Sequence, residues 1–241
     1  MAVGQSMRSI HDNLQAVRGR IAHAARAAGR DPGSVTLLAV SKTHPAALVE
    51  QALASGQRSF GENYVQEAVE KMDALAGKLG QERARALEWH MIGPLQSNKT
   101  RLVAARFDWV QSVESEKIAR RLSEQRPAGL PALNILVQVN VSGEASKSGV
   151  APDAVAALAN AISSLPNLKL RGLMAIPEPG ADAVRYQELR GLYERLKPEF
   201  RFDTLSVGMS DDLDDAIAGG STMVRIGTAI FGARQKIRPA A

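Results

Sequence analysis

Short apolar segments alternate with stretches of helical periodicity from one end of this 241-residue chain to the other. The segments are rich in branched residues, which indicates buried strands, and the stretches between them carry apolar residues at spacings of three and four, which indicates amphipathic helices. We expect eight strands, at Val35–Val40, 58–63, 87–93, 108–113, 133–141, 168–176, 204–208 and 222–227. Strands that alternate with helices favour a parallel sheet covered by helices.

Eight strands in about 240 residues match a closed (β/α)8 barrel of the TIM type. One extra helix is expected before the first strand, at Met7–Ala28, and the others at 45–56, 64–80, 97–106, 115–125, 152–165, 181–197 and 211–220. The alternative is an open doubly wound sheet, but no G-x-G-x-x-G loop follows the first strand. Because no Gly/Ser-rich linker divides the chain, we expect one barrel domain over residues 1–241.

The net charge of +5 and the pI near 9.7 suit an anionic ligand. Positive and negative residues are mixed along the chain and only 4% of residues are aromatic, which argues against a specific nucleic-acid partner. The chain has no cysteine, and so no disulfide, thiolate metal site or cysteine nucleophile. The first residues become polar too early for a signal peptide, and no apolar run approaches the length of a membrane span. We expect a cytoplasmic protein with no membrane partner.

In a TIM barrel the carboxyl ends of the strands and the loops after them form the functional face. Lys42 follows the first expected strand by two residues, where it either begins a solvated loop or serves as an amine nucleophile at the barrel mouth. Further candidates at strand ends are Asn63, His90, Met174 and Asn140 with the polar loop 142–149. His90 is also compatible with a role in the core, and the four histidines of the chain form no metal-ligand pattern.

The loops after strands seven and eight commonly bind phosphate in this architecture. The sequence "GMSDD" offers Gly208 and the hydroxyl of Ser210 before an expected helix, and "RIGT" offers Gly227 and Thr228. Amides and the dipole at a helix start favour an anion. Each feature alone fits an N-cap or a turn, but their occurrence in both loops predicts a phosphate site.

Arg225 lies between apolar residues of the eighth expected strand. A buried guanidinium requires either a carboxylate partner or a ligand. Near such a cation the charged form of Lys42 would be disfavoured, and a neutral amine condenses with aldehydes. A phosphorylated aldehyde would fit both ends of the site. Pyridoxal 5′-phosphate and the substrate of a barrel aldolase are two such molecules.

Six motifs extend this interpretation: "AVSKTHP", "FGENYVQE", "WHMIGPLQSNK", "VNVSGEASKSG", "GLMAIP" and "GMSDDLDDAIAGGSTMVRIGTAIFGAR". In order and spacing they closely resemble the pyridoxal-phosphate homeostasis protein family, whose members are related to the barrel domain of alanine racemase and other fold-type III enzymes. The resemblance extends from about residue 8 to 234.

The resemblance implies that Lys42 carries pyridoxal phosphate as an imine and that Arg225 faces the pyridine nitrogen. It further implies that the phosphate is bound by Ser210, Gly227 and Thr228, and that Asn63, His90 and Met174 line the pocket.

Such a site need not be catalytic, and two arguments favour a non-enzymatic carrier. Arginine cannot accept a proton from the ring nitrogen, so the cofactor would be a weak electron sink. Racemisation also needs a second base, which alanine racemase takes from a separate β-domain, whereas this sequence ends at Ala241. We therefore expect a monomer that takes part in vitamin B6 and amino-acid homeostasis, with apo-enzymes as candidate recipients of the cofactor.

Two other functions remain open on the sequence alone. One is a fold-type III racemase or decarboxylase whose second base comes from Tyr64 or a partner chain. The other is an aldolase that uses Lys42 without a bound cofactor.

Overall fold

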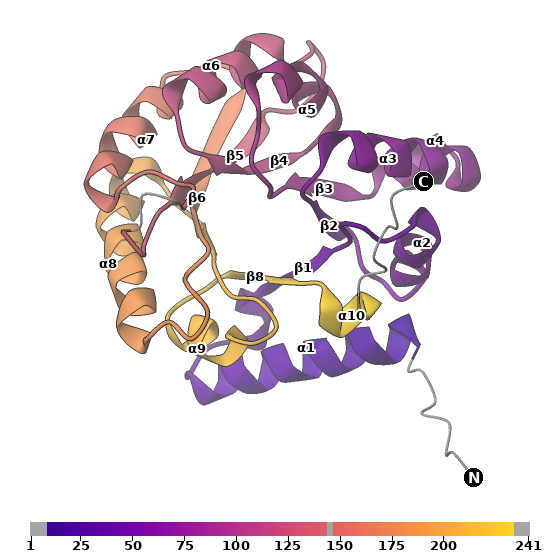
Figure 1. Ribbon diagram of the computed structural model, residues 1–241, viewed down its shortest axis with the longest axis horizontal. Coiled ribbons are helices and arrows are strands. Elements are labelled where there is room, and N and C mark those ends of the chain that lie inside the picture. Colours follow the sequence, from indigo (N-terminus) through magenta and orange to yellow (C-terminus); the bar gives the residue numbers. More distant parts are fainter. Residues whose placement is uncertain (1–8, 144–146, 234–241) are drawn as a thin grey trace, which may run out of the picture.

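The computed structural model describes residues 9–143 and 147–233, and within them eight parallel strands form a closed barrel (Figure 1). Each strand pairs with the next in sequence order, and β8 pairs with β1, which closes the barrel. The strands are β1 (Thr36–Val40), β2 (Ser59–Glu62), β3 (Glu88–Met91), β4 (Trp109–Val113), β5 (Leu133–Val139), β6 (Leu168–Ala175), β7 (Thr204–Ser206) and β8 (Met223–Ile226). The predicted (β/α)8 fold is confirmed.

Helices surround the barrel on its outside (Figure 1). They are α1 (Ile10–Ala27), α2 (Ala46–Ala54), α3 (Val65–Leu79), α4 (Gln81–Arg85), α5 (Thr100–Arg106), α6 (Glu116–Gln125), α7 (Val155–Ser163), α8 (Ala183–Phe200), α9 (Leu213–Ala218) and α10 (Thr228–Phe231). The expected extra helix is α1, which contacts α9 and α10. Its first turn is stabilised by a capping box between Ser9 and Asp12.

Two short helices were not predicted from the sequence. The stretch that forms α10, Thr228–Phe231, has only four residues and is too short to show a helical period. The chain ends β8 at Ile226, and Gly227 then serves as the N-cap of α10. Helix α4 follows α3 after Gly80, whose φ of 80° interrupts the longer helix.

Side chains of the strands alternate between the helix layer and the barrel interior. The outward-facing ones join one large hydrophobic core with the helices. The interior holds two smaller apolar clusters, Leu38, Val40, Ile92 and Met223 in one and Trp109, Leu136 and Met174 in the other. The barrel also contains buried polar residues, among them His90, Gln111, Ser206 and Arg225.

Gly208 fixes the loop that follows β7. Its φ is 102°, and a Cβ atom there would lie 2.5 Å from Cβ of Ala216 on α9. Helix α9 is therefore the close neighbour of Gly208. Among the described residues, no helix is both long and apolar enough to cross a membrane.

Candidate functional site

A cavity of about 520 Å³ opens at the carboxyl end of the barrel strands. It brings together six of the residues that the sequence singled out: Lys42, Asn63, Ser210, Arg225, Gly227 and Thr228. The other lining residues are Val40, Ile92, Ile176, Met209, Asp211 and Ala229. Residues 42 and 228 become neighbours because β1 and β8 pair. The cavity thus combines an amine, a guanidinium, two hydroxyls and a carboxamide.

Lys42 follows β1 and is partly buried. The residue before it, Ser41, is tied to a buried ion pair between Lys71 and Glu62. The hydroxyl of Ser41 donates to Oε1 of Glu62 at 2.6 Å, and its carbonyl accepts from Nζ of Lys71 at 2.8 Å. Nζ of Lys71 also lies 2.5 Å from Oε1 of Glu62. The backbone on this side of Lys42 is therefore fixed by charged groups behind the barrel wall.

The residue after Lys42 is held from the same side. The amide N–H of Thr43 donates to Oε1 of Glu67 at 2.6 Å, and this carboxylate lies 3.1 Å from Nζ of Lys71. Thr43 has a φ of 63°, a conformation that is costly for a β-branched residue and persists only where its surroundings enforce it. Both neighbours of Lys42 are thus anchored through Lys71.

Arg225 lies at the cavity with only 4% of its surface exposed. Its Nη1 donates to the carbonyl and the hydroxyl of Ser206, both at 2.8 Å, and its Nη2 donates to the carbonyl of Ala175 at 2.8 Å. No ion pair joins it to a carboxylate within the described part of the chain. Of the two alternatives for a buried arginine, this arrangement favours the ligand. Burial lowers the pKa of Arg225 to about 10, opposed by the charge of Asp212, so the group stays a cation at neutral pH.

The two loops expected to bind phosphate flank one side of the cavity. Helix α9 begins at Leu213 with Asp212 as its N-cap, so Ser210 lies in the turn before the helix and is not the cap. Gly227 is the N-cap of α10, and Thr228 is its first residue. A Cβ atom on Gly227 would lie 3.1 Å from the carbonyl oxygen of Val40, so a larger residue would crowd β1.

Asn63 provides an unsatisfied polar atom at the cavity. Its Oδ1 is buried and has no hydrogen-bond partner in the structure. Buried polar atoms are normally satisfied, and an orphaned one beside a cavity indicates a partner that a ligand would supply. Gly93 allows the backbone of Asn63 to approach closely, since a Cβ atom there would lie 2.5 Å from the carbonyl oxygen of Asn63.

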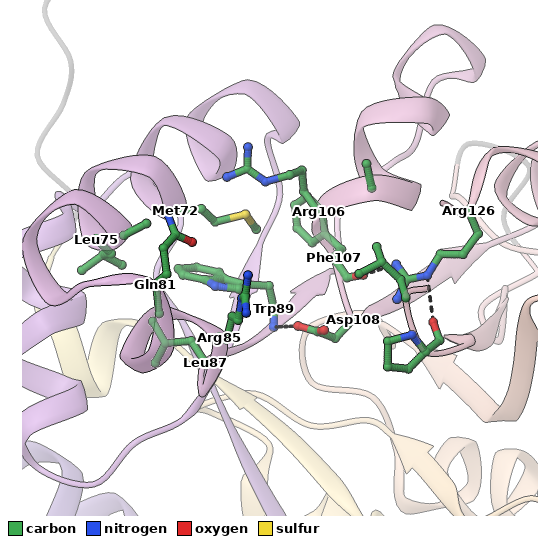
Figure 2. Close-up of a pocket in the computed structure, with 15 residues that line it drawn as sticks. Met72, Leu75, Gln81, Arg85, Leu87, Trp89, Arg106, Phe107, Asp108 and Arg126 are labelled. Carbon is green, nitrogen blue, oxygen red and sulfur yellow. Dashed lines mark hydrogen bonds between the residues drawn. The ribbon is translucent and has the colours of Figure 1, made fainter. Parts of the chain in front are cut away.

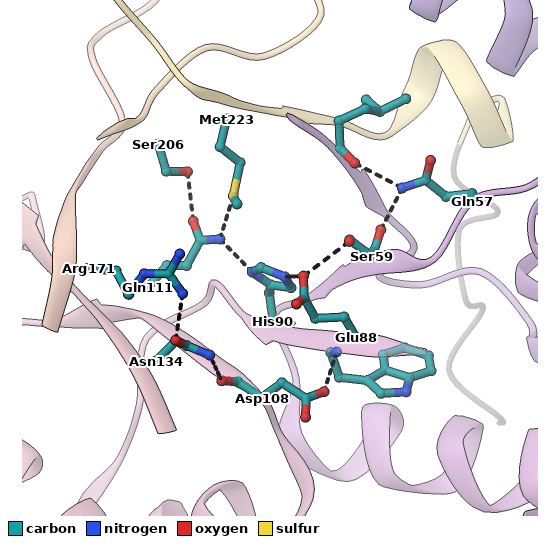
Figure 3. A network of polar contacts seen from close by, with 12 residues as sticks. Gln57, Ser59, Glu88, His90, Asp108, Gln111, Asn134, Arg171, Ser206 and Met223 are labelled. Carbon is teal, nitrogen blue, oxygen red and sulfur yellow. Dashed lines mark hydrogen bonds and ion pairs between the residues drawn. The ribbon is translucent and has the colours of Figure 1, made fainter. Parts of the chain in front are cut away.

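His90 and Met174 lie deeper in the barrel and are not among the residues that line the cavity. The ring of His90 stacks on Trp109 with centroids 5.0 Å apart, and it contacts Glu88 and Gln111 (Figure 3). Met174 packs in the barrel interior against Trp109. Complete burial lowers the pKa of His90, opposed by its hydrogen bond to Glu88. The pattern of alternating residues places both side chains inside the barrel but does not indicate their depth.

Sequence reasoning missed Lys71 as a supporting residue. It lies on α3 among Ala68, Met72 and Leu75, which form the buried face of that helix. A lysine on an apolar helix face, four residues after Glu67, is the signal that could have revealed it.

A second cavity, of about 220 Å³, lies outside the barrel wall and contains none of the predicted site residues (Figure 2). Trp89 and Phe107 contribute to its apolar surface, and Arg126 lies on one side of it. Nη1 of Arg126 donates to the carbonyls of Ala104 and Phe107, both at 2.7 Å. Arg126 thereby joins the end of α6 to the chain around α5 and has a structural role here.

Comparison with known proteins places the chain among proteins of one family. A model of the family described as "Alanine racemase, N-terminal domain" matches residues 13–235. The pyridoxal phosphate homeostasis protein of Pseudomonas aeruginosa is 58% identical over 236 residues, which cover 97% of this chain and 100% of the relative. The protein of the same name from Escherichia coli is 53% identical and covers 95% of this chain and 98% of its own length.

Solved structures of related proteins resemble this chain over most of its length. PipY of Synechococcus elongatus, solved with PLP bound, is 36% identical with a TM-score of 0.79, covering 93% of this chain and 100% of its own. Alanine racemase from Corynebacterium glutamicum, 15% identical with a TM-score of 0.65, covers 93% of this chain and 62% of its own and shares the fold. The chain therefore belongs to the alanine racemase N-terminal domain family and, within it, to the pyridoxal phosphate homeostasis proteins.

Proposed function

We propose that this protein binds pyridoxal 5′-phosphate through Lys42 and takes part in vitamin B6 and amino-acid homeostasis as a carrier without catalytic turnover. In the binding step Nζ of Lys42 adds to the aldehyde carbon, and water leaves as the imine forms. The observation that carries the proposal is the single cavity shared by Lys42, Arg225, Ser210, Gly227 and Thr228. The names of the relatives and the PLP bound to PipY support it.

The residues of the cavity fit the cofactor in charge and hydrogen bonding. Hydroxyls of Ser210 and Thr228 and the amides of the loops around them are suitable donors to a phosphate. Arg225 can donate to a pyridine nitrogen. The orphaned buried Oδ1 of Asn63 would gain a partner from a donor on the ligand, or its amide group could turn to donate to the ring hydroxyl.

The same residues favour binding over turnover. A protonated Arg225 leaves an adjacent ring nitrogen without a proton, which weakens the cofactor as an electron sink. Within the described part of the cavity lining, the titratable side chains are Lys42, Asp211 and Arg225. Tyr64, the candidate within this chain for the second base of a racemase, is 57% exposed and is not a lining residue. We extend the proposal to a cytoplasmic monomer that passes the cofactor to apo-enzymes.

Reduction with borohydride tests the binding step directly. The protein is incubated with pyridoxal phosphate, reduced and digested, and the adduct is located by mass spectrometry. We expect the adduct on Lys42, and we expect Lys42→Ala to abolish both the adduct and the visible absorbance band. Lys169→Ala removes an exposed lysine of β6 and is the matched control. An adduct on another lysine, or none, would refute the proposal.

Proton exchange separates the carrier from a racemase. Holo-protein is incubated with L-amino acids in deuterated water, and the α-proton is followed by NMR. A carrier produces no sustained exchange. Exchange over many turnovers would instead favour a fold-type III enzyme.

A further inference from the structure

A continuous series of polar side chains crosses the interior of the barrel, and Figure 3 shows its part from Ser206 to Glu88. Nη1 of Arg225 donates to Oγ of Ser206 at 2.8 Å, and that hydroxyl donates to Oε1 of Gln111 at 2.7 Å. Nε2 of Gln111 lies 2.8 Å from Nδ1 of His90. Nε2 of His90 in turn lies 2.8 Å from Oε1 of Glu88. We call these five side chains the polar chain, and it joins the cavity to the amino end of β3.

The neighbours of His90 determine which ring nitrogen carries the proton. An amide nitrogen only donates, so Nδ1 of His90 accepts from Gln111 and carries no proton. An ionised carboxylate only accepts, so Nε2 of His90 donates to Glu88. Burial disfavours the ionised form of Glu88, but its interactions with His90, Trp109 and Ser59 together outweigh burial and hold the pKa of this carboxyl below its usual range.

The opposite orientation of the Gln111 amide does not satisfy these partners. It would require a proton on Nδ1 of His90, and a neutral ring would then face the carboxylate of Glu88 with an unprotonated nitrogen. A doubly protonated ring would avoid this, but His90 is completely buried, which disfavours its charged form. Sδ of Met223, a weak acceptor, lies 3.1 Å from Nε2 of Gln111 and agrees with the orientation in the structure.

Every hydrogen bond of the polar chain therefore points the same way, from a cation to an anion. Arg225 lies at one end, buried and held otherwise by the carbonyls of Ser206 and Ala175. Glu88 lies at the other, with its side chain 42% exposed. Hydrogen bonds in such a series polarise one another in a low dielectric. Two further carboxylates act on members of the polar chain, Asp212 on Arg225 and Asp108 on His90.

We propose that the polar chain positions Arg225: it fixes the guanidinium at the cavity and balances its charge from the far end of the barrel. Glu88 and His90 are then positioning residues for a pyridine ring bound against Arg225, and neither residue touches that ring. The statement about the bound ring rests on the proposed function, whereas the polar chain is a property of the protein alone.

The first test needs no ligand. Nitrogen-15 NMR of histidine-labelled protein, with His90→Gln to assign the signal, reports the proton on each ring nitrogen. We expect a protonated Nε2 and an unprotonated Nδ1 at neutral pH. Ser206→Ala should shift the Nδ1 signal, because Ser206 is joined to His90 through Gln111. Ser221→Ala, equally buried but bonded to backbone carbonyls, is the matched control and should leave the signal in place.

The second test uses pyridoxal phosphate bound to the full-length protein. The pH midpoint of its visible absorbance band is compared among wild type, Glu88→Gln and Asp203→Asn. Glu88 and Asp203 lie at the same end of the barrel, each pairs with a basic residue, and their side chains are 42% and 49% exposed. We expect Glu88→Gln to lower the midpoint by about half a pH unit, on the order of one charge acting through protein. Asp203→Asn should lower it much less.

The outcomes separate the two levels of the inference. A field that acts only through space would move both midpoints alike, and equal shifts would therefore overturn the role of the polar chain at the ligand. A proton on Nδ1 of His90, or no response of its signal to Ser206→Ala, would overturn the proposed hydrogen-bond order of the polar chain. Failure of borohydride to label Lys42 would refute the proposed function, and the NMR test would still decide the polar chain.

Discussion

Nζ of Lys71 lies 2.5 Å from Oε1 of Glu62, with 3% and 0% of the two side chains exposed. Removal of one partner leaves an uncompensated buried charge, which typically costs about 3–5 kcal/mol. We therefore expect Lys71→Met to lower the free energy of unfolding by about 3–5 kcal/mol, measured by urea denaturation. Arg120→Ala, which breaks the exposed pair of Arg120 with Glu116, should change it by less than about 1 kcal/mol.

The double variant Glu62→Leu with Lys71→Met tests the same explanation. Because it removes both charges, it should recover about half or more of the stability lost in Lys71→Met. A double variant as unstable as the single one would show that the loss comes from packing and not from charge.

The lowered pKa values of His90 and Glu88 predict that acid destabilises the fold. Burial lowers the pKa of His90 from 6.5, so the unfolded chain binds this proton first and stability falls as the pH drops below about 6.5. Glu88, whose pKa is lowered from 4.5, adds a second loss below about pH 4.5. His90→Gln should flatten the dependence of the unfolding free energy on pH between about 6.5 and 5, whereas His23→Gln, on the exposed side of α1, should preserve it.

The backbone conformation of Gly208 predicts that a larger residue at this position destabilises the loop after β7. Gly208→Ala must hold a φ of 102° and place Cβ 2.5 Å from Cβ of Ala216. We expect a loss of about 1–3 kcal/mol in unfolding free energy and weaker binding of pyridoxal phosphate, because the loop that carries Ser210 moves. Gly77→Ala on α3 meets no atom within 4 Å and should be neutral or stabilising by up to about 1 kcal/mol. Equal effects of the two variants would contradict this account.

Thr228→Val tests the phosphate end of the proposed site. Loss of a hydrogen bond to a charged group costs about 1.5–3 kcal/mol, so the affinity for pyridoxal phosphate should fall by about 10- to 100-fold. Pyridoxal without its phosphate should bind the variant and the wild type alike, as measured by titration of the visible band. Thr36→Val, at the amino end of β1, is the control and should leave both affinities unchanged.

Much of the fold could be predicted because strands and helices have different periods. The run that ends in Val40 and the one that contains Arg225 both have the pattern of strands, and the structure brings Lys42 and Thr228, which follow them, to one cavity. The pattern does not show how deep in the barrel a strand residue lies. On the sequence alone His90 is therefore compatible with the pocket or with the core, and the structure places it outside the lining of the cavity.

Hydrogen bonds between distant residues could not be predicted from the sequence. Gln111 and Ser206 are 95 residues apart and lie on separate strands, and no local pattern links them. The sequence places the hydroxyl of Ser210 at the start of an expected helix, where a serine also fits an N-cap. In the structure the N-cap residue of α9 is Asp212, whose side chain makes no capping hydrogen bond to the helix and instead accepts one from the amide N–H of Met209 at 2.6 Å.

The pairing of β8 with β1 gives ligand binding a further consequence. Lys42 and Thr228 belong to opposite ends of the chain and meet only when the last strand closes the ring. A molecule that contacts both would therefore recognise the finished barrel and no shorter folding intermediate. At a concentration 100 times its dissociation constant it would add about 2.7 kcal/mol to the stability of the closed form, so that cofactor supply and the lifetime of the folded protein become linked.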